Sequence, residues 1–152
     1  PQIIGMFQRH ILPQFPNKDK IKIVRREALE YIEKAMTPVD YDFAFVDLWH
    51  GGEDGLPLYV KIKKMERRFT KTTFSYWLET SLLVMLRRCV LTLLEEEMSG
   101  ATDADYSHAE SPIDALINAL HKLLKQTPIS SYQNVLDLVS DNALKKLAEK
   151  IL

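Results

Sequence analysis

The spacing of hydrophobic residues divides the chain into a front part that mixes helix with strand and a back part that is helical. Near the start, isoleucine, phenylalanine and leucine recur at helical spacing up to residue 12, and Pro13 and Pro16 end this predicted helix. The stretch 21–24, Ile-Lys-Ile-Val, then changes period and predicts a short strand. Residues 28–35 return to helical spacing and predict a second helix.

A nearly unbroken apolar run at residues 43–46 predicts the next strand. Its apolar residues face both ways, which is typical of a parallel strand covered on each side. Between this strand and residues 21–24 lie the dozen or so residues that a parallel crossover connection requires. Residues 21–46 therefore predict a strand, a helix and a second strand, with the two strands parallel.

After Gly55 the pattern predicts helices alone. Residues 56–69 read as an amphipathic helix, and residues 72–97 as a longer one that Ser99 and Gly100 stop. Ser111 and Pro112 have the residue types of an N-cap and a first helical position, and two shorter helices follow after residue 130. We expect an α/β fold, with a partial parallel sheet of strand, helix and strand in residues 1–70 and an all-helical region in residues 71–152.

Composition and charge narrow the class of protein. The chain has 152 residues, of which 46% are hydrophobic and 27% charged, as in ordinary globular domains. A net charge of −1 argues against a protein held as a whole by nucleic acid or an anionic membrane. No apolar stretch approaches the roughly 20 residues of a membrane span, and no signal-peptide pattern opens the chain. The single Cys89 fits a reducing compartment, so we expect a cytoplasmic location.

Candidate chemistry gathers directly after the predicted strand 43–46. Asp47 is a candidate general base or positioning acid, with a carboxylate that caps the loop as the alternative. His50 is a second candidate for acid–base catalysis, because histidine is a residue type suited to it, although a lone loop histidine is more often simply exposed. Trp49 has a ring suited to stacking on a cofactor or substrate, and packing against the following helix is the favoured alternative.

The order of these features resembles the central part of class I S-adenosylmethionine-dependent methyltransferases and the related spermidine synthases. The resemblance covers residues 7–66, in which a helix leads to a strand, an acidic and a small residue (Glu27 and Ala28) follow it, and the next strand ends in Asp47. It implies a Rossmann-like sheet and a cofactor, S-adenosylmethionine, bound near Glu27, Ala28, Asp47 and Trp49. It also implies catalytic roles for Asp47 and His50. The family usually has Asp where this chain has Glu27.

Other features of the family do not occur in this sequence. The glycine-rich turn that lets the backbone approach the cofactor is missing, since no Gly-x-Gly pattern occurs in the chain. The acid that holds the ribose hydroxyls is missing too. In the family the third and fourth strands are not neighbours, so residues 21–24 and 43–46 must leave a gap, pair directly or borrow strands from a second copy. We expect direct parallel pairing or a homodimer.

Two charged segments have functional and structural interpretations. The basic segment 61–71 contains six Lys or Arg residues among aromatic neighbours and suits an RNA backbone, but a solvated helix face is favoured, and nucleic acid is not an expected partner. Asp103, Asp105, His108 and Glu110 are potential metal ligands, but they lack the pattern of a calcium loop and favour a polar linker without a metal.

Two hypotheses of different classes follow. In the first, the chain is a fragment of a methyltransferase-like enzyme that acts on an unidentified acceptor, transferring a methyl or an aminopropyl group, and it is inactive alone because it lacks the main cofactor cradle. In the second, the helices from Thr72 onward form a non-catalytic oligomerisation or protein-interaction module, and the α/β part is a relic.

Overall fold

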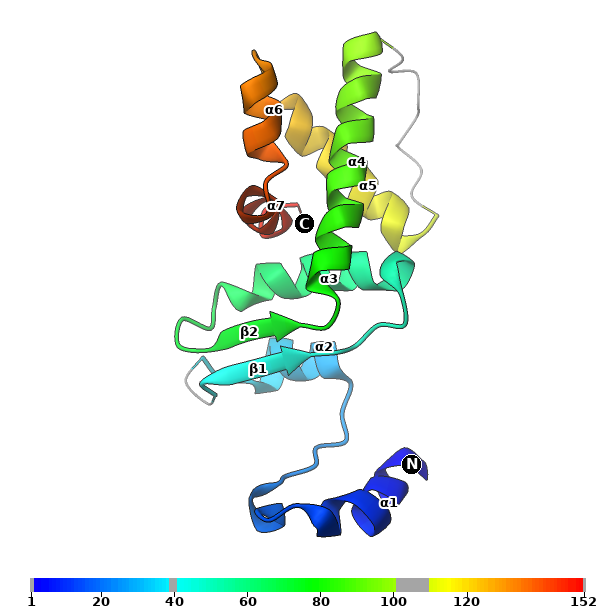
Figure 1. The fold of residues 1–152 in the computed structure, drawn as a ribbon, viewed down its shortest axis with the longest axis vertical. Coiled ribbons are helices and arrows are strands. Elements are labelled where there is room, and N and C mark those ends of the chain that lie inside the picture. Colours follow the sequence, from blue (N-terminus) through cyan, green and yellow to red (C-terminus); the bar gives the residue numbers. More distant parts are fainter. Residues whose placement is uncertain (1, 39–40, 101–109, 152) are drawn as a thin grey trace.

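The computed structural model describes residues 2–38, 41–100 and 110–151. Figure 1 shows a two-stranded sheet near the middle of an elongated molecule, with long helices beyond one side and a short helical arm beyond the other. The elements in chain order are α1 (Gln2–Met6), η1 (Phe7–Ile11), η2 (Leu12–Gln14), η3 (Lys18–Lys20), α2 (Ala28–Glu30), η4 (Tyr31–Ala35), β1 (Phe43–Val46), α3 (Gly52–Glu66), β2 (Thr73–Tyr76), α4 (Glu79–Ser99), α5 (Pro112–Lys125), α6 (Tyr132–Leu138) and α7 (Asp141–Ala148).

The first predicted helix is confirmed and forms an arm that stands apart from the rest. Residues 2–14 are helical throughout, passing from α-helical to π-helical and then 3-10 geometry before the chain turns extended at Phe15. None of the helical residues of the arm is buried. In Figure 1 a stretch of irregular chain connects this arm to α2.

The strand predicted at residues 21–24 is wrong. These residues are exposed and belong to no sheet, although the second predicted helix follows them as α2 and η4. A strand exists only when its backbone groups find a partner strand, and residues 21–24 pair with no strand among the described residues. Direct pairing of residues 21–24 with residues 43–46 is therefore also wrong within the single chain.

The predicted strand 43–46 is confirmed as β1, and its partner is β2. The two strands are parallel, and the register places Phe43 opposite Thr73 and Val46 opposite Tyr76. Helix α3 lies between the strands in sequence and provides the crossover that a parallel pair requires. The sheet therefore takes one strand from each of the two predicted regions, β1 from residues 1–70 and β2 from residues 71–152.

The prediction of one helix over residues 72–97 is wrong at its beginning, because β2 occupies its first residues and α4 begins at Glu79. Thr73, Phe74 and Tyr76 are β-branched or aromatic residues, which favour strands. The C-terminal region is thus helical only from α4 onward. Its later helices are confirmed: α5, α6 and α7 all form, and the Ser111 hydroxyl accepts a hydrogen bond from the backbone N–H of Asp114.

One face of the sheet is buried and the other is bare. Ala44, Val46 and their partners Phe74 and Tyr76 contribute to the hydrophobic core, as expected for alternate positions on one face. On the opposite face Phe43 and Phe45 keep 59% and 57% of their surface exposed. The prediction of a strand covered on both sides therefore holds for only one side within the described residues.

The core continues from the buried sheet face into α3. The ring of Tyr76 lies parallel to Trp49 and edge-on to Tyr59 of α3, with ring centres 6.4 and 5.0 Å apart. Helix α3 in turn contacts α4, α5 and α7, whose buried leucines complete the core. These helices and the sheet share one hydrophobic core.

A partly buried polar network lies within this core. The Tyr59 hydroxyl donates to Glu79 of α4 at 2.9 Å, and Lys145 of α7 donates to the same carboxylate at 2.8 Å. Lys63 is buried and donates to Glu66 at 2.7 Å. Burial, followed by the nearby acids, raises the pKa of Tyr59 well above its usual range. The Glu79 carboxylate therefore joins α4 to both α3 and α7, and its two partners have their hydrogen bonds within the core.

Within the described residues, no helix is both long enough and apolar enough to cross a membrane.

Gly55 permits the close approach of α3 to Trp49. A Cβ atom at this position would lie 2.9 Å from Cγ of Trp49 and 3.1 Å from Cδ2 of Leu82. Gly55→Ala should therefore destabilise the fold by about 1–3 kcal/mol, the usual cost of overpacking. Chemical denaturation measures it, with Gly5→Ala as the control, because the nearest atom there belongs to the flexible Arg9 side chain 3.8 Å away. Equal stability of the two variants would contradict this account of the packing.

Candidate functional site at the carboxyl end of the sheet

The loop between β1 and α3 holds three of the predicted site residues in very different surroundings. Asp47 is exposed, and no hydrogen bond or ion pair of its side chain appears among the described residues. Trp49 is buried, and the side chain of His50 is fully exposed. The loop therefore presents one carboxylate and one imidazole to solvent on either side of a buried indole.

Trp49 fixes this loop to the end of β2. Its indole Nε1–H donates a hydrogen bond to the backbone carbonyl of Trp77 at 3.1 Å, and its ring stacks on Tyr76. The Trp77 N–H donates in turn to the carbonyl of Val46 at 2.9 Å. The predicted packing of Trp49 against the following helix is confirmed, because a Cβ atom added at Gly55 of α3 would lie only 2.9 Å from Cγ of the indole. Cofactor stacking by the Trp49 ring stays an untested prediction.

Asp54 organises the start of α3 beside His50. Its carboxylate accepts hydrogen bonds from the backbone N–H groups of Gly51 and His50, at 2.9 and 3.0 Å, and lies 3.4 Å from Nδ1 of His50. Acceptance from these N–H groups lowers the pKa of Asp54 below its usual value. The loop cap that was one interpretation of Asp47 is thus supplied by Asp54, and the Asp47 carboxylate is left to solvent.

Glu27 caps a helix in the same way. Its side chain accepts from the N–H groups of Glu30 and Leu29, at 2.6 and 3.1 Å, and these bonds lower its pKa. Lys61 of α3 adds a smaller electrostatic contribution in the same direction. Glu27 therefore has a structural role at the start of α2, and contact with a cofactor stays a prediction.

Ala28 and the end of β1 are brought together around a cavity of about 250 Å³. The cavity lies between the α2–η4 helix and the buried side of β1. Its lining residues are Val24, Arg26, Ala28, Tyr31, Ile32, Met36, Ala44, Phe45, Val46, Leu48 and Phe74. Of the two predicted segments, Glu27-Ala28 contributes through Ala28, and the segment around Asp47 contributes through its neighbours Val46 and Leu48.

Two residues at the end of β2 were missed in the sequence. Trp77 is 51% exposed and follows the last residue of β2, in the place where Asp47 follows the last residue of β1. Leu78 adopts a left-handed backbone with φ of 58°, which is unusual for a residue other than glycine. The run of strand-favouring residues from Thr72 to Trp77 is the sequence signal that places them at a strand end.

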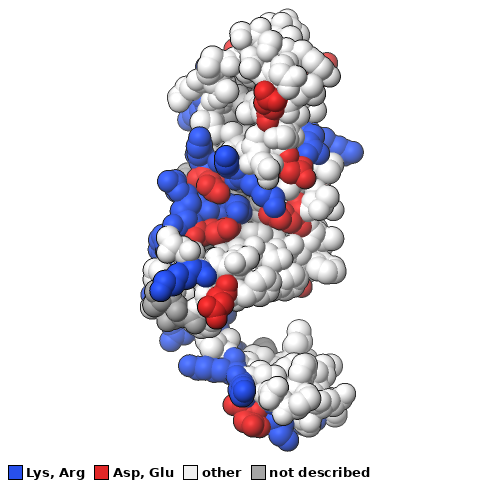
Figure 2. Space-filling view, turned by 60° about the vertical axis from the view of Figure 1, so that its left-hand side comes forward, with Lys and Arg blue, Asp and Glu red and all other residues white. Residues whose placement is uncertain are grey.

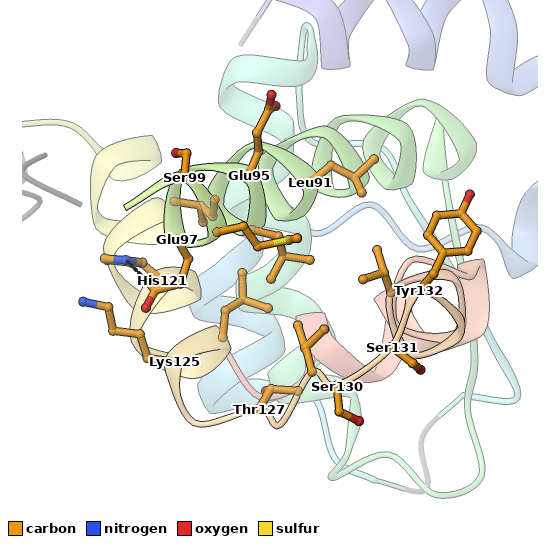
Figure 3. Close-up of a pocket in the computed structure, with 16 residues that line it drawn as sticks. Leu91, Glu95, Glu97, Ser99, His121, Lys125, Thr127, Ser130, Ser131 and Tyr132 are labelled. Carbon is orange, nitrogen blue, oxygen red and sulfur yellow. Dashed lines mark ion pairs between the residues drawn. The ribbon is translucent and has the colours of Figure 1, made fainter. Parts of the chain in front are cut away.

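A larger groove of about 1080 Å³ lies elsewhere, among α4, α5 and the start of α6. Figure 3 shows His121 of α5 and Glu97 of α4 directed toward each other, and their ion-pair distance is 3.7 Å. The other labelled polar residues include Lys125 and Ser131, whereas leucines, Met98 and Val135 supply most of the apolar lining. No predicted site residue lines this groove.

The basic segment 61–71 is partly used inside the fold. Lys63 pairs with Glu66, and the Arg68 guanidinium donates to the backbone carbonyls of Ile32 and Glu33. Figure 2 shows Lys and Arg side chains near the middle of the molecule with acidic side chains between them. Of the potential metal ligands of the linker, Asp103, Asp105 and His108 lie outside the described residues, and in the described part no three potential ligands lie together.

Comparison of the chain with models of known protein families, with curated proteins and with solved structures finds no match.

The cap formed by Asp54 predicts a pH dependence of stability. Because its pKa is lowered on folding, the ionised Asp54 stabilises the fold above the ordinary value of 3.8, and this contribution is lost as pH falls through the lowered pKa. The melting temperature of the unmodified chain should exceed that of Asp54→Asn above about pH 5, and the difference should vanish at lower pH.

Glu53→Gln is the matched control, because it removes a charge from the same helical turn without removing the cap. Thermal melts of the three proteins at a series of pH values provide the measurement. A pH profile of Asp54→Asn that coincides with that of Glu53→Gln would show that the cap does not stabilise α3.

Proposed function

We propose that the chain is part of a class I S-adenosylmethionine-dependent methyltransferase-like enzyme and is inactive by itself. The observation that carries the proposal is the pair of parallel strands joined through α3, with Asp47 directly beyond the first strand. In open parallel sheets, ligands bind beyond the carboxyl ends of the strands. In this proposal β1 corresponds to the fourth strand of the family and β2 to the strand beside it.

The cavity beside β1 supports a cofactor site that is only partial. Ala28 and Leu48 line it from the two segments that the resemblance implies for cofactor binding. Its volume of about 250 Å³ lies below the range of roughly 300–1,000 Å³ that is usual for ligand pockets. The residues present therefore suit one ring system of the cofactor, and the sequence has no glycine-rich turn to hold the remainder.

The chemistry that this site supports is positioning and proton transfer. A bound S-adenosylmethionine would supply an electrophilic methyl group for in-line transfer to the acceptor. The Asp47 carboxylate has no competing partner among the described residues, so it is free to hold the acceptor N–H or O–H and to take its proton. His50 lies on the same loop with a fully exposed ring and is the second candidate base.

A second candidate function follows from the groove among α4, α5 and α6. The groove is large and mostly apolar, and the side chains of Met98 and Tyr132 in it are exposed. Exposed apolar surface of this kind favours a protein-interaction module, with the groove as its binding surface. In this alternative the sheet only supports the helices. Retention of a partner by Asp47→Asn, together with loss of that partner by Met98→Glu, would favour the module.

Calorimetry with S-adenosylhomocysteine, the stable product of methyl transfer, tests the proposed function. We expect the 152-residue chain to bind weakly, with a dissociation constant of about 1 mM, or about −4 kcal/mol. Ala28→Phe should abolish this binding by filling the cavity, whereas Ser131→Ala, in the distant groove, should leave it unchanged.

Two results would contradict the proposal. Submicromolar binding by the chain alone would mean that the cofactor site is complete, so the partial site described above would be wrong. Binding that Ala28→Phe leaves unchanged, or no binding at millimolar ligand, would show that the cofactor does not bind in the cavity beside β1.

A further inference from the structure

The outer edge of β1 has no partner among the described residues. The sheet contains β1 and β2 alone, so the backbone N–H and C=O groups on the far side of β1 meet no other strand. The bare sheet face adjoins this edge and exposes Phe43 and Phe45. Unpaired edges of this kind accept an extended segment through backbone hydrogen bonds, with side-chain pairs that set the register.

Residues 21–24 have the properties of a strand without a partner. Ile21 has extended backbone angles, φ −85° and ψ 116°. Ile21, Ile23 and Val24 are exposed despite being apolar. In Figure 1 this part of the chain runs away from the sheet toward the N-terminal arm. Only Val24, next to α2, reaches the cavity beside β1 in its own chain, and none of the four residues pairs with β1 there.

The charges beside these two segments are complementary. Residues 18–26 contain three lysines and two arginines against the single Asp19. Asp42 and Asp47 are exposed at the two ends of β1. The outer edge of β2 is less suitable for a basic segment, because the exposed cations Arg67, Arg68 and Lys71 precede β2.

We propose that residues 21–24 of a second copy of this chain pair in parallel with the outer edge of β1, and that the two copies exchange these segments reciprocally. One register satisfies both the apolar pattern and the charges. It places Lys20 opposite Asp42, Ile21 opposite Phe43, Lys22 opposite Ala44, Ile23 opposite Phe45, Val24 opposite Val46 and Arg25 opposite Asp47. Reciprocal exchange of an identical segment closes a symmetric dimer.

This register places both isoleucines on the bare face of the sheet, and it places Lys22 beside Ala44 at the outer edge of the opposite face. Ile21 and Ile23 fall on the bare face and cover Phe43 and Phe45. Val24 falls on the face covered by helices, together with Val46, a residue that already lines the cavity beside α2. A shift by one residue would place Lys22 among the exposed phenylalanines, so the pairing is specified by more than charge. The inference rests on the sheet edge and does not depend on methyl transfer.

Mixed-chain disulfide cross-linking tests the exchange directly. In a Cys89→Ala background, one chain carries Ile23→Cys and the other carries Phe45→Cys. Because each chain has a single thiol, a disulfide between the two variants requires residue 23 of one copy to meet residue 45 of another. We expect efficient formation of the mixed dimer on mild oxidation, whereas Ser131→Cys mixed with Ile23→Cys should give little.

The double variant Ile23→Cys/Phe45→Cys separates exchange from closure within one chain. Exchange predicts covalent dimers from this variant. A cross-linked monomer would overturn the proposal, since it would mean that residues 21–24 pair with β1 of their own chain. Absence of cross-links in the mixture would overturn it as well.

Charge reversal provides a second test that introduces no cysteine. Lys20→Glu or Asp42→Lys alone should each raise the dissociation constant of the dimer about tenfold, because each reversal places like charges opposite one another in both exchanged segments. The double variant Lys20→Glu/Asp42→Lys should restore the dimer. Lys18→Glu lies outside the paired register and is the matched control. Analytical ultracentrifugation measures the dissociation constant, and a monomeric unmodified chain, or equal effects of Lys18→Glu and Lys20→Glu, would refute the proposal.

Discussion

The structure depends on the attachment of the loop after β1 to the end of β2. Trp49 provides this attachment through its hydrogen bond to the Trp77 carbonyl and through its packing between Tyr76 and Gly55. This contact joins the end of β2 to the loop that leads from β1 into the first turn of α3. With Trp49 buried, Asp47 before it and His50 after it project into solvent at the end of the sheet.

One face of the sheet is buried in the core, and the other is exposed and available for binding. The helix-covered face carries the aromatic core, and the polar network of Tyr59, Glu79 and Lys145 extends that core to the C-terminal helix. The opposite face and the outer edge of β1 contribute exposed apolar side chains and unpaired backbone groups. The proposed exchange with a second copy uses this incompletely covered side, whereas the proposed cofactor site uses the strand ends and the cavity on the helix-covered side.

Much of the fold was predictable because its signals are local. The apolar run of β1 and the capping residue Ser111 act within a few positions of themselves. The strand expected at residues 21–24 failed for a non-local reason, since apolar alternation makes a strand only where a partner is available. The strand at Thr73–Tyr76 lies in a stretch whose apolar residues also have helical spacing, and its β-branched and aromatic residues favour the strand that forms.

The candidate site was predictable only in part. Asp47 was found because an acid after an apolar strand is visible in sequence, but the capping roles of Glu27 and Asp54 depend on backbone geometry at the helix starts. Trp77 enters the site through the register of β2 with β1, which pattern analysis of one segment does not contain.

The most direct measurement is the backbone amide NMR spectrum of the chain during titration with S-adenosylhomocysteine. We predict shifts that saturate at millimolar ligand and are confined to the residues that line the cavity beside β1, among them Ala28, Val46 and Leu48. Shifts confined to the groove near His121 and Lys125, or no shifts at all, would contradict a cofactor site at the carboxyl end of the sheet.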